Sequence, residues 1–411
     1  MHRLGELLSE PAFLRVWLIG ACAGVARWFE MLVVGVFAFE ATGSPFLVAL
    51  LVILRLMPLA VFGSIVGTFA DRVPPRLLLL AGLLLATAVA STVCVLFALG
   101  VAEYWHVAVA TFASGVIWTT DMPIRRRMLG DVAGRERLAP AMSLDSATNN
   151  GTRMLGPLLG GVLYQWLGPT GAFALTTLLY AVSLALILGV PAAASTVTGT
   201  GPSTKVLRDL QDGFRFAASD RDLLRILLVT VVFNVWGFPF VSMIPVIGKD
   251  ELALSAGWIG ALAAMEGAGA FLGALVIAVS ARQTAFRRIY YFGVLGHLSF
   301  IFLAGWMHNA FAIAAIFFCV GLAGACFSTM QSTLTYSVAP AEMRSRIFGL
   351  LTICIGAGLI GFCNIGVMGE WFGGSAAIRI VAAEGLIPLL LIGIGWRQLK
   401  YRGAADLTVG R

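Results

Sequence analysis

Long apolar stretches alternate with short polar ones along almost the whole chain. Each apolar stretch has about 20 residues or more, which is enough for an α-helix to cross the hydrocarbon core of a membrane. Strands of a membrane β-barrel are only about half as long, so the pattern predicts an all-α polytopic membrane protein. The twelve expected spans are 13–39, 45–70, 77–100, 104–124, 141–168, 170–192, 223–248, 255–281, 288–307, 309–337, 347–369 and 375–397.

One longer polar stretch, residues 193–222, divides the spans into six and six. This predicts an N-terminal six-helix bundle over residues 1–192, a linker, and a C-terminal six-helix bundle over 223–411. Within the linker, the apolar residues of KVLRDLQDGFRFAASDRD fall on one helical stripe, with the charges opposite. The stripe predicts an amphipathic helix on the inner leaflet, or else a solvated linker helix. Its members are Leu207, Leu210, Phe214 and Ala217.

The two halves also resemble each other in sequence. When the chain is shifted by 206 residues without gaps, six glycines of the first half fall on glycines of the second half, and Arg76 falls on Arg282. Duplicated halves around a central site are typical of secondary transporters. The shift therefore favours two pseudo-symmetric bundles that alternate access to a shared cavity.

Composition supports the membrane assignment, and the charge distribution gives its orientation. Only 12% of residues are charged, about half of what a soluble domain needs to cover its surface. With the N-terminus placed in the cytoplasm, 23 of the 28 Lys and Arg residues fall on cytoplasmic segments or helix ends. Lys249 is the one in an outer loop, and Arg27, Arg55, Arg153 and Arg379 lie within spans. The net charge of +7 thus reflects topology, with both termini cytoplasmic, and does not indicate nucleic acid binding.

No catalytic or metal-binding pattern is found. The six cysteines lie inside spans without CxxC spacing, and neither HExxH nor GxSxG occurs. We therefore expect no enzyme activity and no cofactor.

The turn GTFADRVPPR joins the second and third spans and contains Gly67, Asp71, Arg72 and Arg76. It resembles the loop signature Gly-x-x-x-Asp-Arg-x-Gly-Arg-Arg of the major facilitator superfamily, with two prolines where that pattern has Gly-Arg. In this reading the turn is a conformational gate. Gly67 lets two helices approach, and Asp71 offers a carboxylate to a helix N-terminus or an arginine. The alternative is a positively charged turn with a capping aspartate.

A second match lies on the fifth span, where RMLGPLLGGVLY contains Gly156, Pro157, Gly160 and Gly161. It resembles the end of the antiporter motif of the same superfamily, which implies export and a further part of the gate; the alternative is ordinary tight helix packing. Residues 123–157 as a whole resemble the group of exporters that contains the enterobactin exporter. The resemblance extends over almost the whole chain and implies twelve helices in two six-helix bundles.

Five charged residues are expected near mid-depth: Arg27, Glu30, Arg55, Arg153 and Glu266. A charge there costs about 2.5–3.5 kcal/mol, so each needs a partner or a task. Arg27 and Glu30 are three residues apart on one helix, so they could neutralise each other locally. The fifth and eighth spans meet in the superfamily, which implies a gating pair between Arg153 and Glu266. A carboxylate that changes neighbours changes its affinity for a proton, so Glu30 and then Glu266 are candidates for proton coupling, against permanent structural pairing.

Other buried polar residues have more local expectations. Asp121 and Asp145 are expected to pair with the arginines at positions 125–127, while Glu384 and His297 have no assigned partner. The expected substrate-binding residues combine positive, aromatic and amide groups, which suits an amphipathic aromatic or anionic molecule. They are Arg27, Trp28, Arg55, Asn234, Trp236 and Gln331.

These features favour a proton-coupled exporter of a small amphipathic molecule, siderophore-like or drug-like, working by alternating access. The expected partners are that substrate, protons and the lipid bilayer, and the protein is expected as a monomer in a bacterial inner membrane. A lysophospholipid or lipid transporter and an importer of the same fold remain alternatives. A membrane enzyme and a scaffold that transports nothing are further alternatives from other classes.

Overall fold

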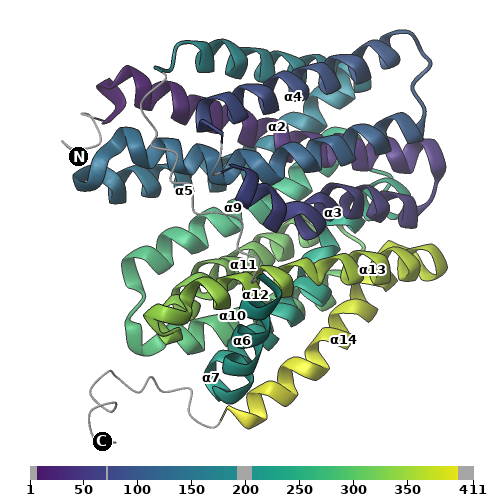
Figure 1. The fold of residues 1–411 in the computed structure, drawn as a ribbon. Coiled ribbons are helices and arrows are strands. Elements are labelled where there is room, and N and C mark those ends of the chain that lie inside the picture. The colour runs from purple at the N-terminus through teal and green to yellow at the C-terminus, as the bar shows by residue number, and fades with distance from the viewer. Residues whose placement is uncertain (1–6, 71–72, 192–205, 397–411) are drawn as a thin grey trace, which may run out of the picture. The chain divides into compact units, whose positions relative to one another are not determined.

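The computed structural model describes residues 7–70, 73–191 and 206–396, with side chains except at 62–70, 135, 139, 206–210, 341, 345 and 395. Every predicted span coincides with a helix in this part of the chain, and the described residues contain no strand (Figure 1). Asp71, Arg72 and most of the linker lie outside the described residues. The first half comprises α2 (Pro11–Thr42), α3 (Pro45–Ala70), α4 (Pro75–Ala98) and α5 (Tyr104–Leu188).

The long helix α5 contains the fourth, fifth and sixth predicted spans. It is interrupted at two glycines, Gly134 with φ 72° and Gly168 with φ 63°. Only glycine adopts such positive φ values readily, and Pro169 after Gly168 suits the start of a new helix. Residues 125–140, which the predicted spans leave out between the fourth and the fifth, are helical on both sides of Gly134. Ion pairs that join Arg125 and Arg126 to the following helical segment favour this arrangement.

The seventh span is irregular. It begins as α7 (Arg221–Val232) and continues through the π-helix η1 (Phe233–Gly237) and the 3₁₀-helix η2 (Phe238–Met243). The short α8 (Ile244–Val246) and a second π-helix, η3 (Ile247–Glu251), complete it. Pro239 and Pro245 lack the N–H groups that a regular α-helix would use here, and π-helical turns are frequent at functional sites.

The remaining helices complete the second half of the chain. They are α6 (Val206–Ser219), α9 (Ala256–Ser280), η4 (Gln283–Ala285), α10 (Phe286–Ala304), α11 (Ala310–Val338), η5 (Ala341–Met343), α12 (Arg344–Gly356), α13 (Gly358–Phe372) and α14 (Gly374–Gly395). Gly373, with φ 84°, separates α13 from α14 and corresponds within one residue to Gly168 after the 206-residue shift. The two halves thus break their last helix pair at nearly the same place.

The chain forms two compact units, which are described separately. The first comprises Met1–Thr204 and Ser242–Gly267, and the second comprises Lys205–Val241 and Ala268–Arg411. The second half of the chain therefore contributes residues 242–267 to the first unit.

In the first unit, α2 and α4 pack along α5, as can be followed in Figure 1. Their shared core is aliphatic and aromatic, with Phe13, Ile19, Leu79, Leu83 and Leu129 almost fully buried. Within a membrane, close packing of such side chains holds the helices against one another.

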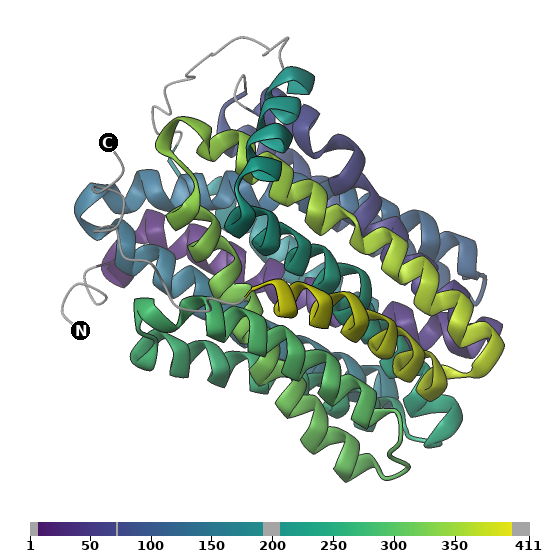
Figure 2. The same cartoon turned by 90° about the horizontal axis from the view of Figure 1, so that it is seen from below.

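In the second unit, α14 packs on α10, and α10 packs on α11 (Figure 2). Stacked rings strengthen this core: Phe233 and Phe327 lie 3.7 Å apart between ring centroids. Tyr290 also stacks on Phe327, with the ring centroids 5.6 Å apart. Such aromatic contacts add to the stability beyond the buried area alone.

The linker helix α6 packs on protein, which neither sequence expectation included. Ala217 is buried in a cluster with Ile347 and Leu351 of α12, and Asp212 lies 3.4 Å from Arg346. Phe214, from the same predicted stripe, is 63% exposed. The apolar stripe is therefore shared between a protein contact and an exposed face.

Large apolar side chains cover the outer surfaces of both units. Trp166, Val279 and Ile394 are 78%, 84% and 74% exposed, which in water would be unfavourable. Among the described residues, nine helices are long and apolar enough to cross a membrane by length and composition. These surfaces are those of a multi-pass membrane protein whose backbone polar groups are satisfied within helices.

Replacing Gly115 with alanine is expected to lower the unfolding temperature of the purified protein in detergent. A Cβ at this position would lie 2.3 Å from the backbone oxygen of Arg55, so α3 and α5 would have to move apart. The control is Gly151→Ala, on the same helix, where a Cβ meets nothing within 4 Å. Alanine there should stabilise the helix by about 0.5–1 kcal/mol. Equal effects of both changes would contradict the close α3–α5 contact.

Candidate functional site

The first unit contains a buried carboxylate, Glu30 of α2, paired with an arginine of α3. Arg55 Nη2 lies 3.3 Å from Glu30 Oε2, and the two residues are only 6% and 4% exposed. Tyr180 of α5 lies close to the same carboxylate. An isolated charge at this depth is costly, so breaking the pair would leave an unfavourable buried ion on either side.

Arg27, one turn before Glu30, is directed toward α5 instead. Its Nη2 atom lies 3.6 Å from Asp121 Oδ2, and its guanidinium lies 5.1 Å from the centroid of the Trp118 ring. The prediction that Arg27 and Glu30 neutralise each other is therefore wrong, since each pairs with a residue of another helix. Three-residue spacing places two side chains on neighbouring positions of one helix, but partners on adjacent helices decide the pairing here.

The chain of charges continues along α5. Asp121 Oδ2 is 3.7 Å from Arg125 Nε, Arg125 Nη1 is 2.5 Å from Asp145 Oδ1, and Arg126 Nε is 2.9 Å from Asp145 Oδ2. The prediction that Asp121 and Asp145 pair with these arginines is confirmed. A Cβ on Gly20 would lie 2.3 Å from Arg125 Nη1, so this glycine of α2 leaves the space that the guanidinium occupies.

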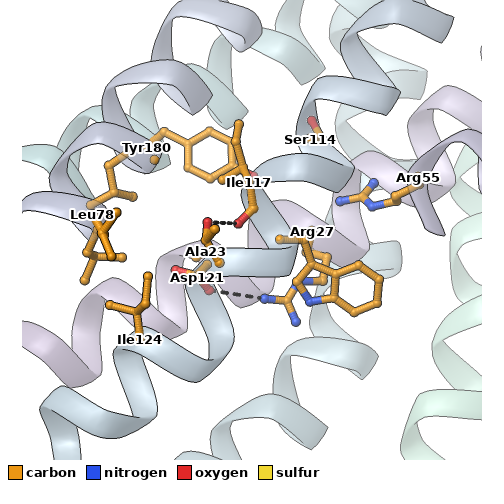
Figure 3. A pocket seen from close by; sticks show the side chains of 14 residues that line it. Ala23, Arg27, Arg55, Leu78, Ser114, Ile117, Asp121, Ile124 and Tyr180 are labelled. Atoms are coloured by element: carbon orange, nitrogen blue, oxygen red, sulfur yellow. Dashed lines mark hydrogen bonds and ion pairs between the residues drawn. The ribbon is translucent and has the colours of Figure 1, made fainter. Parts of the chain in front are cut away.

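A cavity lies beside these ion pairs in the first unit (Figure 3). Its wall is formed by Ala23, Arg27, Arg55, Leu78, Leu79, Gly82, Leu83, Ser114, Ile117, Trp118, Thr120, Asp121, Ile124 and Tyr180. In Figure 3, Arg27 extends toward Asp121, and Leu78, Ile124 and Tyr180 lie across the cavity from Arg55. Charged groups on one side and apolar or aromatic groups on the other are typical of a site for an amphipathic molecule.

Two of the three predicted substrate-binding residues of the first half, Arg27 and Arg55, line this cavity. Trp28 is placed differently. The Arg153 guanidinium lies 5.2 Å from the centroid of the Trp28 ring, and a Cβ on Gly156 would lie 2.6 Å from the Cβ of Trp28. Trp28 thus packs against the fifth span, beside Arg153 and Gly156.

In the second unit, Asn234 and Gln331 are brought together at Thr230. Asn234 Nδ2 donates to the Thr230 carbonyl oxygen at 2.9 Å, and Gln331 Nε2 donates to Thr230 Oγ1 at 3.4 Å. The Tyr290 hydroxyl completes this neutral cluster, 2.8 Å from Thr230 Oγ1. Trp236 is not part of it, because its Nε1 donates to Glu384 Oε2 at 3.1 Å.

The fifth and eighth spans meet within the first unit through a bidentate ion pair. Arg153 Nη2 donates to Glu266 Oε1 at 2.6 Å, and Arg153 Nε donates to Glu266 Oε2 at 3.0 Å. Glu266 is 4% exposed. The predicted Arg153–Glu266 pair is therefore present, while its role in gating stays a prediction, as does the role of Glu266 in proton coupling.

Exchanging the two charges tests this pair. Arg153→Glu and Glu266→Arg alone are each expected to reduce transport and lower the unfolding temperature, because each places two like charges together. The double variant restores the attraction and should recover most of both losses. Transport in vesicles and thermal unfolding in detergent are the two measurements. Losses that simply add in the double variant would show that the pair contributes nothing specific.

The glycine-rich motif on the fifth span faces two helices. Gly156 and Gly160 lie against Trp28 and Phe29 of α2. Gly161 lies against α9, where a Cβ on it would be 2.8 Å from the Cα of Gly260, and a Cβ on Gly260 would be 2.5 Å from the Pro157 carbonyl oxygen. Small residues on both helices allow this approach. The motif therefore supports the packing that holds Arg153 beside Glu266, and its role as a gate stays a prediction.

The turn between the second and third spans is described only in part. The backbone of Gly67 is helical at the end of α3. Arg76 Nη2 donates to the Leu188 carbonyl oxygen at 3.1 Å, and Arg76 Nε donates to that of Ile187 at 3.4 Å. A cation at a helix C-terminus donates hydrogen bonds to the free carbonyl oxygens and interacts favourably with the helix dipole. The gating role of Gly67, Asp71, Arg72 and Arg76 remains untested.

A polar cluster that was not predicted from the sequence lies at the C-terminal end of α2. Lys249 Nζ is 2.5 Å from Glu40 Oε1, and the Tyr164 hydroxyl donates to Glu40 Oε2 at 2.6 Å. Gln165 Oε1 accepts hydrogen bonds from Ser255 Oγ and the Gly257 N–H nearby. The only signal in the sequence was that Lys249 is the sole cation in a predicted outer loop.

The isolated histidine of the ninth span has a backbone contact. His297 Nδ1 lies 3.0 Å from the Val320 carbonyl oxygen, and its ring packs against Phe233 at 4.7 Å. No cluster of three or more His, Cys, Asp or Glu side chains suited to a metal ion occurs in the described part of the chain.

Comparison with known proteins gives a consistent result. The sequence model of the Major Facilitator Superfamily matches residues 16–362. An uncharacterized MFS-type transporter of Bacillus subtilis (strain 168), YfiS, is 24% identical over 391 residues, covering 90% of this chain and 89% of its own. Macrolide efflux protein A of Streptococcus pyogenes is 19% identical over 240 residues, covering 58% of this chain and 59% of its own.

Solved structures resemble the fold over nearly its whole length. The nucleoside transporter NupG (D323A mutant) has a TM-score of 0.79 at 11% identity, covering 94% of this chain and 100% of its own. A bacterial homologue of the human lysosomal transporter Spinster, inward-facing and unoccupied, has a TM-score of 0.71 at 14% identity, covering 96% and 98%. A POT family transporter in complex with 5-aminolevulinic acid has a TM-score of 0.75 at 11% identity, covering 95% and 96%. These identities show a shared fold and leave the substrate open.

Proposed function

Because this chain belongs to the Major Facilitator Superfamily and is a multi-pass membrane transporter, we propose that it is a proton-coupled exporter of a small amphipathic molecule. The observation that carries the proposal is the chain of buried charges beside the cavity of the first unit. There Glu30 is held by Arg55, and Arg55 also lines the cavity. One arginine therefore faces both the proposed proton carrier and the proposed substrate site.

This shared arginine couples the two ligands through electrostatics. When Glu30 binds a proton, it no longer neutralises Arg55, so the charge presented to the cavity changes. An anionic group bound at Arg55 and a proton bound at Glu30 would each strengthen the binding of the other, so the two would be transported in the same direction. A cationic group would compete with the proton for the carboxylates, which gives exchange. Export by proton exchange therefore requires a substrate that presents a cationic or neutral polar group, and no anionic one, to the charged side of the cavity, where Arg55 and Asp121 lie.

The cavity lining also supports an amphipathic substrate. Trp118 and Tyr180 offer aromatic faces, and Leu79, Leu83 and Ile124 supply apolar surface. Drug-like molecules bind by burying most of their surface against such groups, with a few polar contacts for orientation. A siderophore-like molecule with several anionic groups fits the proton-exchange linkage less well than a cationic drug-like one.

Two observations support export over import. The first is the resemblance of Gly156-Pro157-x-x-Gly160-Gly161 to the antiporter motif. The second is the similarity to a macrolide efflux protein, which covers 58% of this chain. We further propose that the protein acts as a monomer in a bacterial inner membrane with both termini in the cytoplasm, as the distribution of Lys and Arg indicates.

Comparing cells with and without the protein tests the function. A strain that lacks the gene, one that overproduces the protein and one that overproduces Glu30→Gln are screened for extruded metabolites and for growth on cationic, neutral and anionic amphipathic drugs, macrolides included. We expect the intact protein alone to lower the cellular content of at least one cationic or neutral compound. Higher cellular content on overproduction would indicate an importer, and altered lysophospholipid distribution would indicate a lipid transporter; either would contradict the proposal.

A further inference from the structure

Positive charge is concentrated at one corner of the second unit, where α7 and α10 begin. Residues 220–225 and 282–288 together contain five arginines and two aspartates, a net charge of +3. An ion pair joins the two segments, because Arg287 Nη2 lies 2.9 Å from Asp222 Oδ2. We call these two segments the basic corner. The proposed transport mechanism uses none of its residues.

The end of α14 completes the surroundings of the basic corner and lies beside α7 in Figure 1. Trp396, which directly follows α14, is almost fully buried, and the Arg225 guanidinium lies 6.0 Å from the centroid of its ring. The Trp396 ring also packs edge to face against Tyr291 of α10. Three helices of the second unit therefore meet at this place.

The two aspartates do not neutralise the basic corner. Asp220 caps α7, because its side chain accepts hydrogen bonds from the N–H groups of Asp222 and Leu223. Asp222 is shared between two arginines, at 2.9 Å from Arg287 and 3.7 Å from Arg225. One carboxylate between two guanidinium groups leaves positive charge in excess.

The other arginines of the basic corner have donors to spare. Arg221, Arg282 and Arg288 are exposed, and their side chains form no ion pair or hydrogen bond within the described part of the chain. The Nε atom of Arg287 is buried and has no hydrogen-bond acceptor among the described residues. In addition, α10 begins here without a side-chain cap or an acidic residue in its first turn, so its positive end adds to the field.

The first half of the chain uses the equivalent arginines differently. After the 206-residue shift, Arg15 falls on Arg221 and Arg76 falls on Arg282. Arg15 and Arg76 donate hydrogen bonds to carbonyl oxygens of residues 187–189, at the end of α5. In the part of the second half that the structure describes, Arg221 and Arg282 make no such bond to the end of α14. The protein thus satisfies this pair of arginines in one half and leaves it available in the other.

Apolar side chains are exposed within one helical turn of the basic corner. They are Leu228 on α7, Phe292 on α10 and Ile394 on α14. A free anion such as inorganic phosphate makes no use of an apolar surface. A phospholipid does, because it presents a phosphate at the membrane surface and acyl chains directly below it. Basic sites between membrane helices are known to bind anionic headgroups in this way.

We propose that the basic corner binds the phosphate of an anionic phospholipid from the inner leaflet, as a resident ligand and not as a transported one. The exposed guanidinium groups donate to the phosphate oxygens, and the apolar side chains below them contact the acyl chains. A zwitterionic lipid binds less well, because its ammonium group is repelled by the same arginines. The inference goes beyond the proposed function and does not depend on it, since the cavity is formed by residues of the first unit.

The test counts lipids bound to the purified full-length protein by native mass spectrometry. The protein in detergent is titrated with phosphatidylglycerol or with phosphatidylcholine of the same acyl chains. We expect one phosphatidylglycerol to bind more tightly than any phosphatidylcholine. Arg282→Gln and Arg288→Gln should each weaken this binding about fivefold. Both side chains are exposed, so the variants should fold, which their unfolding temperatures check, and Arg221→Gln serves as a third variant of the same kind.

Arg215→Gln is the matched control, because Arg215 is an exposed arginine of α6 outside the basic corner. It should leave the first phosphatidylglycerol bound as tightly as in the unaltered protein. An equal loss in Arg215→Gln would show a diffuse surface charge and no site. Equal binding of the two lipids would also overturn the proposal.

A second measurement separates a lipid from a free anion. Because a ligand of the folded state raises the unfolding temperature, phosphatidylglycerol should raise that of the protein in detergent, while inorganic phosphate at millimolar concentration should not. The rise should be smaller in Arg282→Gln. An equal rise with inorganic phosphate would identify a site for soluble anions and contradict the lipid assignment. None of these measurements involves transport, so the failure of either proposal leaves the other standing.

Discussion

Replacing Arg125 with methionine is expected to destabilise the protein by up to about 3–5 kcal/mol, because the buried carboxylates of Asp121 and Asp145 lose the cation they share and keep only Arg27 at 3.6 Å and the more exposed Arg126 at 2.9 Å. Arg125 is 4% exposed, with one nitrogen 2.5 Å from Asp145 and another 3.7 Å from Asp121. Methionine has a similar length and is apolar, so the loss arises from charge and not from a cavity. The measurement is the denaturant or thermal unfolding transition of the purified protein in detergent.

Arg126→Met is the matched control for this prediction. Arg126 also contacts Asp145, at 2.9 Å, but its side chain is 42% exposed. An exposed ion pair contributes about 0–1 kcal/mol, so this variant should unfold close to the unaltered protein. A similar destabilisation by both changes would mean that burial of Arg125 is not what makes its charge important.

Replacing Glu30 with glutamine is expected to abolish transport driven by a pH difference, down to the level of vesicles without protein, while substrate binding is retained. Glutamine still offers an oxygen to Arg55, 3.3 Å from the carboxylate in the structure, but it has no charge and takes up no proton. The energy of the proton gradient then has no route to the substrate. Substrate binding in detergent and pH-driven flux in vesicles are measured on the same preparation.

Glu10→Gln is the control variant for Glu30→Gln. Glu10 directly precedes α2 and also pairs with an arginine, Arg137, at 3.0 Å, but the pair is about a third exposed and lies outside the cavity. It should retain pH-driven flux. Intact coupling in Glu30→Gln would instead move the proton-carrying role to Glu266, the second candidate.

The fold was largely predictable because span length and charge distribution are dictated by the membrane itself. Apolar runs have to match the bilayer, and Lys and Arg gather on the cytoplasmic side, so each span could be located without knowledge of its neighbours. The helical structure of segment 125–140, between the fourth and fifth predicted spans, could not be predicted in this way. Its arginines are polar enough to suggest a loop, yet ion pairs with Asp145 hold the helix on both sides of Gly134.

The site was predictable only where helix neighbours could be inferred. Arg153 and Glu266 were paired correctly because the resemblance supplied which spans meet. Arg27 and Glu30 were paired wrongly because helical spacing shows which residues share a face but not what packs against that face. The partners Asp121 and Arg55 come from other helices.

The same limit applies to the aromatic residues. Trp28 and Trp236 have the composition of substrate-binding side chains, but Trp28 lies against Arg153 and Trp236 binds Glu384. Likewise, nothing local in the sequence places Tyr164 against Glu40. Contacts between distant segments are set by the packing of whole helices, and the single sequence carries little direct information about them.

Flux in vesicles that contain only this protein tests the central proposal most directly. A cationic amphipathic compound identified from the cellular screen is supplied outside inverted vesicles, and its accumulation inside is followed with and without an imposed pH difference, acidic inside. We expect accumulation against the concentration gradient only when the pH difference is present, with protons leaving the lumen as the compound enters. Accumulation that ignores the pH difference, or no movement of any compound that cells extrude, would contradict it.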